Sequence, residues 1–268
     1  MAPIAVIIPV YGNNEKWLTP LLHDIAKEQD LVDLYVVDNL GDYVQPTVFE
    51  HRILRPGINL GWLRGTNFGT IEAVKNNYQY LCWMNNDVRL SNEFFKGLLD
   101  TTSGLLSPCY RGPWEHMYSS SGYSGDASAY APTNNEKQVG WIDGTCMFMP
   151  RQIVNSVGLL DEKFAEFGCG GEIDYSIRAK IAGNPIYVTE RSYLYHFVMG
   201  TVSSEIKQTV QQSDPPEQDV RRLSRRLTKQ YYQSSKLAMT RGLREKWGHN
   251  YKRLAYSRKI SVIDHSFM

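Results

Sequence analysis

The fold is decided by the stretch Tyr80-Leu-Cys-Trp-Met-Asn-Asn-Asp-Val-Arg-Leu90. Five apolar or aromatic residues come first, and the sequence then turns polar at Asn85, Asn86 and Asp87. A short apolar run of this kind predicts a strand that is buried on both faces. Open α/β sheets bind ligands at the carboxyl ends of their strands, where these polar groups would suit a hard cation and a phosphate. This stretch alone leaves a second interpretation open, a polar turn before a helix.

Strands and helices alternate on the N-terminal side of this stretch. Residues 3–9 form a β-branched apolar run that predicts a central parallel strand, followed by a turn and a helix to about residue 29. Short strands are expected at residues 34–37, which end at Asp38 and Asn39, and at residues 52–54. Strand–helix–strand alternation predicts an α/β fold with a parallel, right-handed sheet.

Residues 59–69 contain three glycines and two asparagines, which indicates backbone that turns tightly or approaches a ligand closely. This segment is not a phosphate-binding P-loop, because no Gly-Lys-Ser/Thr follows. A helix is expected from here to about residue 77.

The C-terminal side continues the alternation. Helices are expected at residues 92–99, from Pro150 onward, and at residues 172–182, and strands at 105–109, 139–149, 186–188 and 192–195, the last closing on His196. Residues 110–137 form a long loop, which is usually either functional or disordered. Its aromatic residues favour a loop that faces the substrate; they are Tyr110, Trp114, Tyr118, Tyr123 and Tyr130.

Composition places the chain among ordinary globular proteins, with 42% hydrophobic and 21% charged residues in 268. The strongest apolar run, residues 4–10, is far shorter than the ~20 residues that span a bilayer, and no secretory signal is visible. The cysteines stand singly, which argues against a zinc knuckle or a disulfide scaffold. We therefore expect a cytoplasmic protein with reduced thiols; they are Cys82, Cys109, Cys146 and Cys169.

Charge divides the chain into two parts. Residues 1–204 carry a net charge of −7 and residues 205–268 a net charge of +8, which predicts a basic extension on an acidic domain. Within residues 216–247, apolar residues recur at helical spacing between arginines, as in an amphipathic helix; they are Val220, Leu223, Leu227 and Tyr231. This helix packs on the domain, or it contacts an anionic membrane surface, another subunit or an acidic acceptor. So acidic a domain is poorly suited to binding nucleic acid, although it could bind a nucleotide through a metal ion.

The order of the motifs resembles a known family. They are Pro9-Val10-Tyr11, Val37-Asp38-Asn39, Asn59-x-Gly61 with Asn67, Asn85-Asn86-Asp87, Asp161-Glu162 followed by Gly170-Gly171-Glu172-x-Asp174, and His196. Together they look like a family-two glycosyltransferase with the GT-A nucleotide-diphospho-sugar-binding fold, of the rhamnosyltransferase-like branch. The Gly-Gly-Glu element is also similar to one in galactosyl- and N-acetylgalactosaminyltransferases. The resemblance covers about residues 3–200.

The resemblance implies a metal-dependent enzyme. The last residue of the family's metal motif corresponds to Asp87, and a histidine after the last core strand corresponds to His196. The first motif position, often Asp in the family, is Asn85 here. One carboxylate, one imidazole and diphosphate oxygens favour Mn²⁺ over Mg²⁺.

The donor site is implied in the same way. Asp38 would accept hydrogen bonds from uracil, thymine or guanine, whereas cytosine lacks the required imide N–H. Tyr11, after Pro9, would stack on the base or line the turn. Ribose and diphosphate would be surrounded by Asn59, Gly61, Arg64, Asn67 and Asn86.

The general base is assigned to Glu172, which stands where the family has the base aspartate of Glu-Asp-x-Asp. The glycine pair before it would let the backbone retreat to fit the longer side chain. Asp174 is the alternative base, or it orients the acceptor, or it caps the helix. Asp143 and Trp141 would contact donor or acceptor, or belong to the scaffold.

These features predict a GT-A domain at residues 1–204 and a basic helical extension at 205–268. The expected activity is inverting transfer of one sugar from a UDP- or dTDP-sugar to a glycan, lipid-linked or protein acceptor. A catalytically inactive sugar-nucleotide-binding module is the rival, supported by Glu172 and Asn85 in place of aspartates. A nucleotidyltransferase is disfavoured because no basic loop follows the first strand.

Overall fold

The computed structural model describes residues 2–111, 122–123, 125–165, 169–197, 206, 209–213 and 217–258. Its strands are β1 (Ile4–Val10), β2 (Val32–Asp38), β3 (Arg52–Leu54), β4 (Tyr80–Met84), β5 (Val88–Leu90), β6 (Leu105–Arg111), β7 (Glu136–Gln138), β8 (Cys146–Pro150) and β9 (Ile186–His196). In this part of the chain they form one nine-stranded sheet of order β3-β2-β1-β4-β8-β6-β9-β5, with β7 paired to β9.

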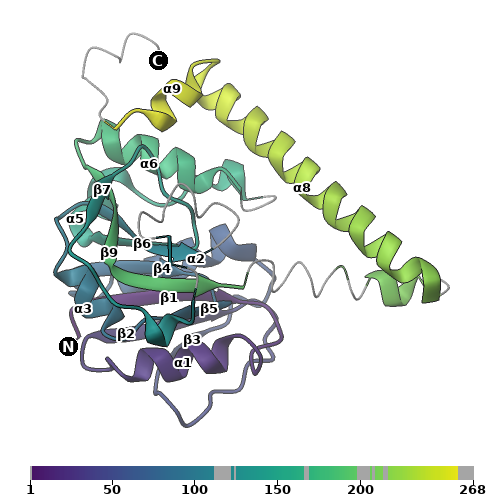
Figure 1. Ribbon diagram of the computed structural model, residues 1–268, viewed down its shortest axis with the longest axis horizontal. Coiled ribbons are helices and arrows are strands. Elements are labelled where there is room, and N and C mark those ends of the chain that lie inside the picture. Colours follow the sequence, from purple (N-terminus) through teal and green to yellow (C-terminus); the bar gives the residue numbers. More distant parts are fainter. Residues whose placement is uncertain are drawn as a thin grey trace.

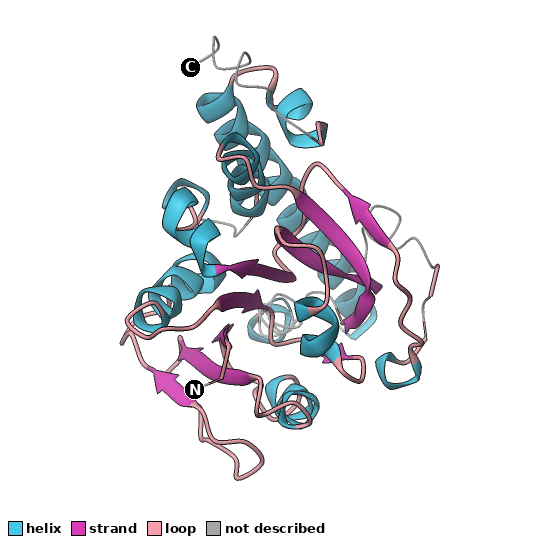
Figure 2. Ribbon diagram, turned by 90° about the vertical axis from the view of Figure 1, so that its left-hand side faces the viewer, coloured by secondary structure: helices cyan, strands magenta, loops and turns pink. Residues whose placement is uncertain are grey.

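Helices cover the sheet on both faces (Figures 1 and 2). They are α1 (Leu18–Ala26), α2 (Gly61–Ala73), α3 (Phe94–Leu99), α5 (Arg151–Val157), α6 (Gly171–Ile181), α8 (Glu217–Trp247) and α9 (Tyr251–Tyr256), with short 3₁₀ turns η1 (Ala127–Ala129) and η2 (Glu162–Phe164). The predicted α/β class is therefore confirmed.

The N-terminal half of the sheet is parallel, as the alternation predicted. β1 lies between β2 and β4, with Ile4 opposite Val32 on one side and Tyr80 on the other. Every residue of β1 is buried, which explains its unbroken apolar sequence. The strand endings at Val10, Asp38 and Met84 consequently lie at one edge of the sheet.

The C-terminal half differs from the prediction because it is mixed. β8 runs antiparallel to β4 and β6, and both β5 and β7 run antiparallel to β9. The strand expected at residues 139–149 begins only at Cys146, and the two expected at 186–188 and 192–195 are the single strand β9. A β-bulge opposite Pro108 and Cys109 interrupts the pattern of β9 and explains the apparent break.

The glycines of residues 59–69 bring α2 onto the sheet. A Cβ at Gly69 would lie 2.5 Å from Ile7 Cγ2 and 3.0 Å from Val37 Cγ2, so only glycine lets the helix approach β1 and β2 this closely. Close approach was expected here, and at Gly69 the approaching group is the protein's own core.

Among the residues that the structure describes, the C-terminal segment packs on the body through the C-terminal part of α8 and through α9. The end of α8 contacts η2, and α9 contacts α6. Leu243, Tyr251 and Ala255 belong to the main hydrophobic core. Figure 1 shows the rest of α8 running away from the body. The helix predicted from residue 216 is confirmed for Glu217–Trp247, and Pro216 lies outside the described residues. No described helix has both the length and the apolar character that crossing a membrane requires.

Candidate active site

Asp87 and His196 meet at the carboxyl edge of the sheet. β5 begins directly after Asp87 and pairs with β9, so that Val88 lies opposite His196. Phe197 N also donates to Asp87 O at 3.0 Å. The imidazole Nε2 lies 3.3 Å from Asp87 Oδ1, and the two side chains are only 12% and 8% exposed. The structure thus brings the two predicted metal ligands together.

The His196 ring is held from two sides. Thr145 Oγ1 lies 3.3 Å from Nδ1, and Asn85 Nδ2 lies 3.4 Å from Nε2. Asn85 N in turn donates to Thr145 O at 2.9 Å. A partner on Nδ1 fixes the ring and turns Nε2 toward Asp87, as the outer shell of a metal site does. Sequence reasoning missed Thr145, which no motif marks.

The Asp87 and His196 side chains fit a divalent cation whose other ligands include phosphate oxygens. Two ligands at about 2.1 Å from one octahedral ion stand about 3 Å apart, close to the observed separation of Nε2 and Oδ1. Within the described residues no three His, Cys, Asp or Glu side chains form a metal-binding group, so oxygens of another molecule would complete the coordination. Asn86 Nδ2 is buried without a hydrogen-bond partner in the described structure, and a bound anionic oxygen would satisfy it.

Glu172 lies in the first turn of α6, and the residue as a whole is half-buried. Oε2 accepts a hydrogen bond from Gly170 N at 2.9 Å. Burial raises the pKa of Glu172 to about 7, and the negative charges of Asp143 and Asp174 add to the increase. Gly170 has φ +95°, and a Cβ there would lie 2.9 Å from Met239 Cγ. The first glycine of the pair is thus needed for its backbone conformation and for the approach of α8.

The segment before β8 connects this acid to the Asp87–His196 pair. Asp143 accepts hydrogen bonds from the Tyr110 hydroxyl and, at 2.9 Å, from Thr145 N. Thr145 contacts the His196 ring, while Ile142 N donates to Ser176 Oγ of α6 at 3.4 Å. Trp141 packs half-buried against the core. Asp143 is therefore linked to both groups, and its predicted contact with donor or acceptor, or its role in the scaffold, stays a prediction.

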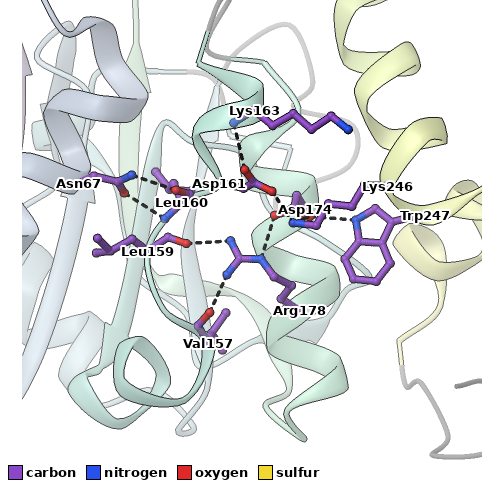
Figure 3. A network of polar contacts seen from close by, with 10 residues as sticks. All are labelled: Asn67, Val157, Leu159, Leu160, Asp161, Lys163, Asp174, Arg178, Lys246 and Trp247. Atoms are coloured by element: carbon purple, nitrogen blue, oxygen red, sulfur yellow. Dashed lines mark hydrogen bonds and ion pairs between the residues drawn. The ribbon is translucent and has the colours of Figure 1, made fainter. Parts of the chain in front are cut away.

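Asp174 does not have the surroundings of a base (Figure 3). Its side chain has no exposed surface. Oδ2 accepts from Arg178 Nε at 2.8 Å, and Oδ1 contacts Lys246 Nζ at 2.8 Å and Trp247 Nε1 at 2.9 Å. A carboxylate that has no exposed surface and is held by three protein donors is not placed to accept the proton of a substrate hydroxyl. These contacts anchor α8 to α6 and count against the alternative assignment of Asp174 as base or acceptor contact, which stays a prediction.

Asn67 also makes structural hydrogen bonds, and its predicted contact with the donor stays a prediction. Its Nδ2 donates to Leu160 O at 2.9 Å and its Oδ1 accepts from Leu160 N at 3.0 Å, in buried surroundings. Both ends of the amide are used, so Asn67 ties α2 to the segment before η2 (Figure 3).

Asp38 ends β2 as predicted, but protein groups already surround it. Its carboxylate accepts from Gly41 N at 2.8 Å, Tyr43 N at 3.1 Å and Arg55 Nε at 3.2 Å. The side chain is fully buried, so it shapes the loop after β2. Direct recognition of a nucleobase by Asp38 stays a prediction that requires this loop to rearrange.

The other predicted donor residues lie around the start of α2. Asn59 Oδ1 accepts from Gly61 N at 2.9 Å, and Asn39, which sequence reasoning left unassigned, accepts from Leu60 N at 3.0 Å. Arg64 is exposed and pairs with Glu162 at 3.2 Å. Pro9 is buried in β1 and Tyr11 is half-buried just after it. Their contacts with a donor stay predictions.

Three aromatic residues of the long loop pack inside the protein. Tyr110 and Tyr130 are buried, and the rings of Tyr123 and Tyr130 lie 5.1 and 4.9 Å from that of Tyr193. Burial of Tyr110 and Tyr130, and the packing of half-buried Tyr123 against Tyr193 of β9, count against the expected substrate-facing surface for these three residues. Trp114 and Tyr118 lie outside the described residues.

Solved structures similar to this chain are glycosyltransferases of the GT-A type. One is GalNAc-T7 with UDP, GalNAc and Mn²⁺, with a TM-score of 0.55 and 13% sequence identity, covering 73% of this chain and 44% of that chain. Another is S. aureus TarS 1-349, with a TM-score of 0.51 and 16% identity, covering 84% of this chain and 69% of that chain. A third is the mannosyltransferase PcManGT from Pyrobaculum calidifontis with GDP-Man and Mn²⁺ (0.51, 12%, 90% and 72%). This chain thus spans less than half of the GalNAc-T7 chain. The predicted GT-A fold is confirmed, and the rhamnosyltransferase-like branch stays a prediction.

Sequence comparison identifies the chain's relatives. No known protein-family profile matches it. Over 209 residues it is 30% identical to the uncharacterized protein Rv1525 of Mycobacterium tuberculosis (strain ATCC 25618 / H37Rv), and equally to the uncharacterized protein Mb1552 of Mycobacterium bovis. Each match covers 76% of this chain and 77% of the relative. With its GT-A fold, the chain therefore belongs to the family of these uncharacterized mycobacterial proteins.

Proposed function

We propose that this protein is an inverting glycosyltransferase that moves one sugar from a UDP- or dTDP-sugar to an acceptor hydroxyl, with Mn²⁺ or Mg²⁺ bound by Asp87 and His196. The observation that carries this proposal is that the segment before β8 contacts both the Asp87–His196 pair and the surroundings of Glu172. Thr145 contacts the His196 ring, and Asp143 acts electrostatically on Glu172. A metal-binding pair and a carboxylate of raised pKa are the two parts that such a reaction needs.

Glu172 is suited to the role of general base. A pKa of about 7 leaves a large ionised fraction at neutral pH while making the carboxylate a better proton acceptor than an ordinary glutamate. Glu172 would take the proton of the acceptor hydroxyl as that oxygen bonds to the anomeric carbon. The bond from this carbon to the nucleoside diphosphate breaks at the same time, and attack from the opposite side inverts the configuration.

The sheet edge is suited to the leaving group. A divalent cation, when bound, would neutralise the charge that develops on the departing nucleoside diphosphate. Asp87 and His196 would hold it, Thr145 would orient the imidazole, and the Asn86 amide would donate to a phosphate oxygen. The presence of Mn²⁺ with nucleotides or nucleotide sugars in GalNAc-T7 and PcManGT supports this assignment.

A thermal-shift panel tests the donor side. UDP-, dTDP- and GDP-sugars are each added to the wild-type protein with and without Mn²⁺, and stabilisation that needs both nucleotide and metal is expected for UDP or dTDP. H196A and D87N should lose the metal-dependent part of the shift, whereas H249A, which removes an exposed histidine, should keep it. Equal metal-dependent shifts in H196A and the wild type would overturn the assignment of the metal site.

The rival function is a module that binds sugar nucleotides without turnover. The full engagement of Asp38 by the protein favours this rival, because a donor would have to compete for that carboxylate. Release of nucleoside diphosphate in the presence of acceptor extracts separates the two. Turnover that disappears in E172Q supports the transferase, and equal background release from both proteins supports the module.

A further inference from the structure

The last turn of α8 supplies hydrogen-bond donors to the first turn of α6. Lys246 Nζ contacts Asp174 Oδ1 at 2.8 Å and Asp161 Oδ2 at 2.6 Å. Trp247 Nε1 donates to the same Asp174 oxygen at 2.9 Å. Asp174 is fully buried and lies two residues from Glu172. The helical turn that carries Glu172 is therefore held from the C-terminal extension (Figure 3).

The other side of this anchor is rigid. Arg178 donates to Asp174 Oδ2 and also to Val157 O at 2.6 Å and Leu159 O at 2.9 Å. Asp174 is thus bonded between a fixed guanidinium on its own helix and two donors from α8. Losing the α8 donors would leave a buried carboxylate only partly paired, which is unfavourable enough to move the helix start.

Side-chain packing brings α8 equally close to the candidate base. Met239 of α8 fills the space that a side chain at Gly170 would occupy, and Gly170 N is the hydrogen-bond donor to Glu172. At the other end of α6, buried Lys180 donates to the carbonyls of Leu254, Ala255 and Ser257 at 2.5, 2.9 and 2.8 Å. The C-terminal extension therefore forms hydrogen bonds with residues near both ends of α6.

We propose that the C-terminal extension is a working part of the active site, in which Lys246 and Trp247 are positioning residues that hold the first turn of α6, and with it Glu172, through Asp174. This inference rests on the proposed function for its catalytic meaning. Under this inference, the predicted GT-A domain (residues 1–204) and the basic extension (residues 205–268) form one functional unit. Removing the contact would alter a site to which α8 contributes no catalytic residue.

The charges around Glu172 give the inference a specific signature. Asp143 from the segment before β8 and Asp174 on α6 both disfavour an ionised Glu172. Arg178 on α6 and Lys246 on α8 balance the charge of Asp174. Replacing Lys246 with a neutral residue leaves more of the Asp174 charge unbalanced, so the pKa of Glu172 should rise further.

The test is a carboxyl titration of the full chain by NMR with ¹³C-labelled glutamate, with E172Q identifying the Glu172 signal. K246M should raise the titration midpoint of Glu172 by about half a unit or more. R244M is the matched control, because it removes an exposed cation from the same helical turn and should leave the midpoint unchanged. W247F keeps all charges and should broaden or shift the signal by displacing the turn. Unchanged Glu172 titration in both K246M and W247F would overturn the inference.

Two further measurements keep the outcomes distinct. If K246M does not fold, the double variant D174N/K246M removes both charges, and its Glu172 midpoint should fall below that of the wild type. Nucleotide-release rates report separately on the proposed function. A shifted titration without any turnover in the wild type would retain the positioning role and reject the transferase, whereas turnover with unshifted titration would do the reverse.

Discussion

Glu172 and Asp174 occupy the same helical turn but lie in opposite surroundings. Glu172 accepts hydrogen bonds only from backbone N–H groups, those of Gly170 and of Glu172 itself, and has a pKa raised to about 7. Asp174 is fully buried and is bonded to Arg178, Lys246 and Trp247. One carboxyl group is desolvated without a cation, and the other is desolvated with two.

The difference shows how to separate a catalytic acid from a structural one. A carboxylate whose lone pairs are all occupied by the protein can exchange nothing with a substrate without breaking those bonds. A carboxyl group that is buried but incompletely paired holds its proton near neutral pH and can accept one during a reaction. The degree of hydrogen-bond satisfaction therefore separates the two roles where residue type and spacing do not.

The largest effect is expected on turnover in E172Q. Glutamine keeps the shape of the side chain but cannot accept the acceptor's proton, so transfer should fall by about 10²–10⁴-fold. Donor binding should remain, because the donor groups lie at the sheet edge. Steady-state release of nucleoside diphosphate measures the rate, and thermal shift with donor and Mn²⁺ measures binding. Wild-type turnover in E172Q would remove Glu172 from the mechanism.

The next largest effect is expected on the stability of D174A, because Asp174 has a structural role and Glu172 a catalytic one. Removing this carboxylate leaves Arg178 and Lys246 without their shared counter-charge, which should lower the free energy of unfolding by about 3 kcal/mol. Urea denaturation followed by tryptophan fluorescence gives this value. E162A, which removes an exposed carboxylate from the neighbouring 3₁₀ turn, serves as the control and should cost about 0.5 kcal/mol or less. A loss in D174A no larger than in E162A would contradict the anchoring role.

Neither role could be read from the sequence alone. The order of motifs predicted that Asp87 and His196 meet at the sheet edge, and the structure brings them together. The assignment of Glu172 as base came from family resemblance and stays a proposal. Asp174 and Asn67 were assigned to substrate from the family motifs. The residues that contact them come from distant segments and could not be foreseen from the sequence; they are Lys246, Trp247 and Leu160. The strands β5 and β7 were not predicted, and the direction of β8 was missed, since a short strand's sequence does not encode the direction of its neighbour.

A smaller effect concerns stability and pH. The pKa of Glu172 is higher in the folded protein than in the unfolded chain, so the folded state binds the proton more tightly. Wild-type stability should therefore decline as pH rises from about 4.5 to about 7, while E172Q lacks this decline. At pH 8 we expect E172Q to be more stable than the wild type by about 1 kcal/mol, allowing for the partial exposure of the group. Parallel stability curves for the two proteins across this range would show that Glu172 is not desolvated.

The smallest effect on stability is expected in R64M. Arg64 and Glu162 are both more than half exposed, so their ion pair should contribute about 0.5 kcal/mol or less. Arg64 nevertheless borders the predicted donor site, and a charge-assisted bond to a phosphate would make it matter for binding. R64M should consequently reduce the donor-dependent thermal shift at unchanged intrinsic stability, whereas E162A, which breaks the same ion pair, should leave that shift intact. Equal donor-dependent thermal shifts in R64M and E162A would show that Arg64 does not bind the donor. Its role would then be structural, like that of Asp174.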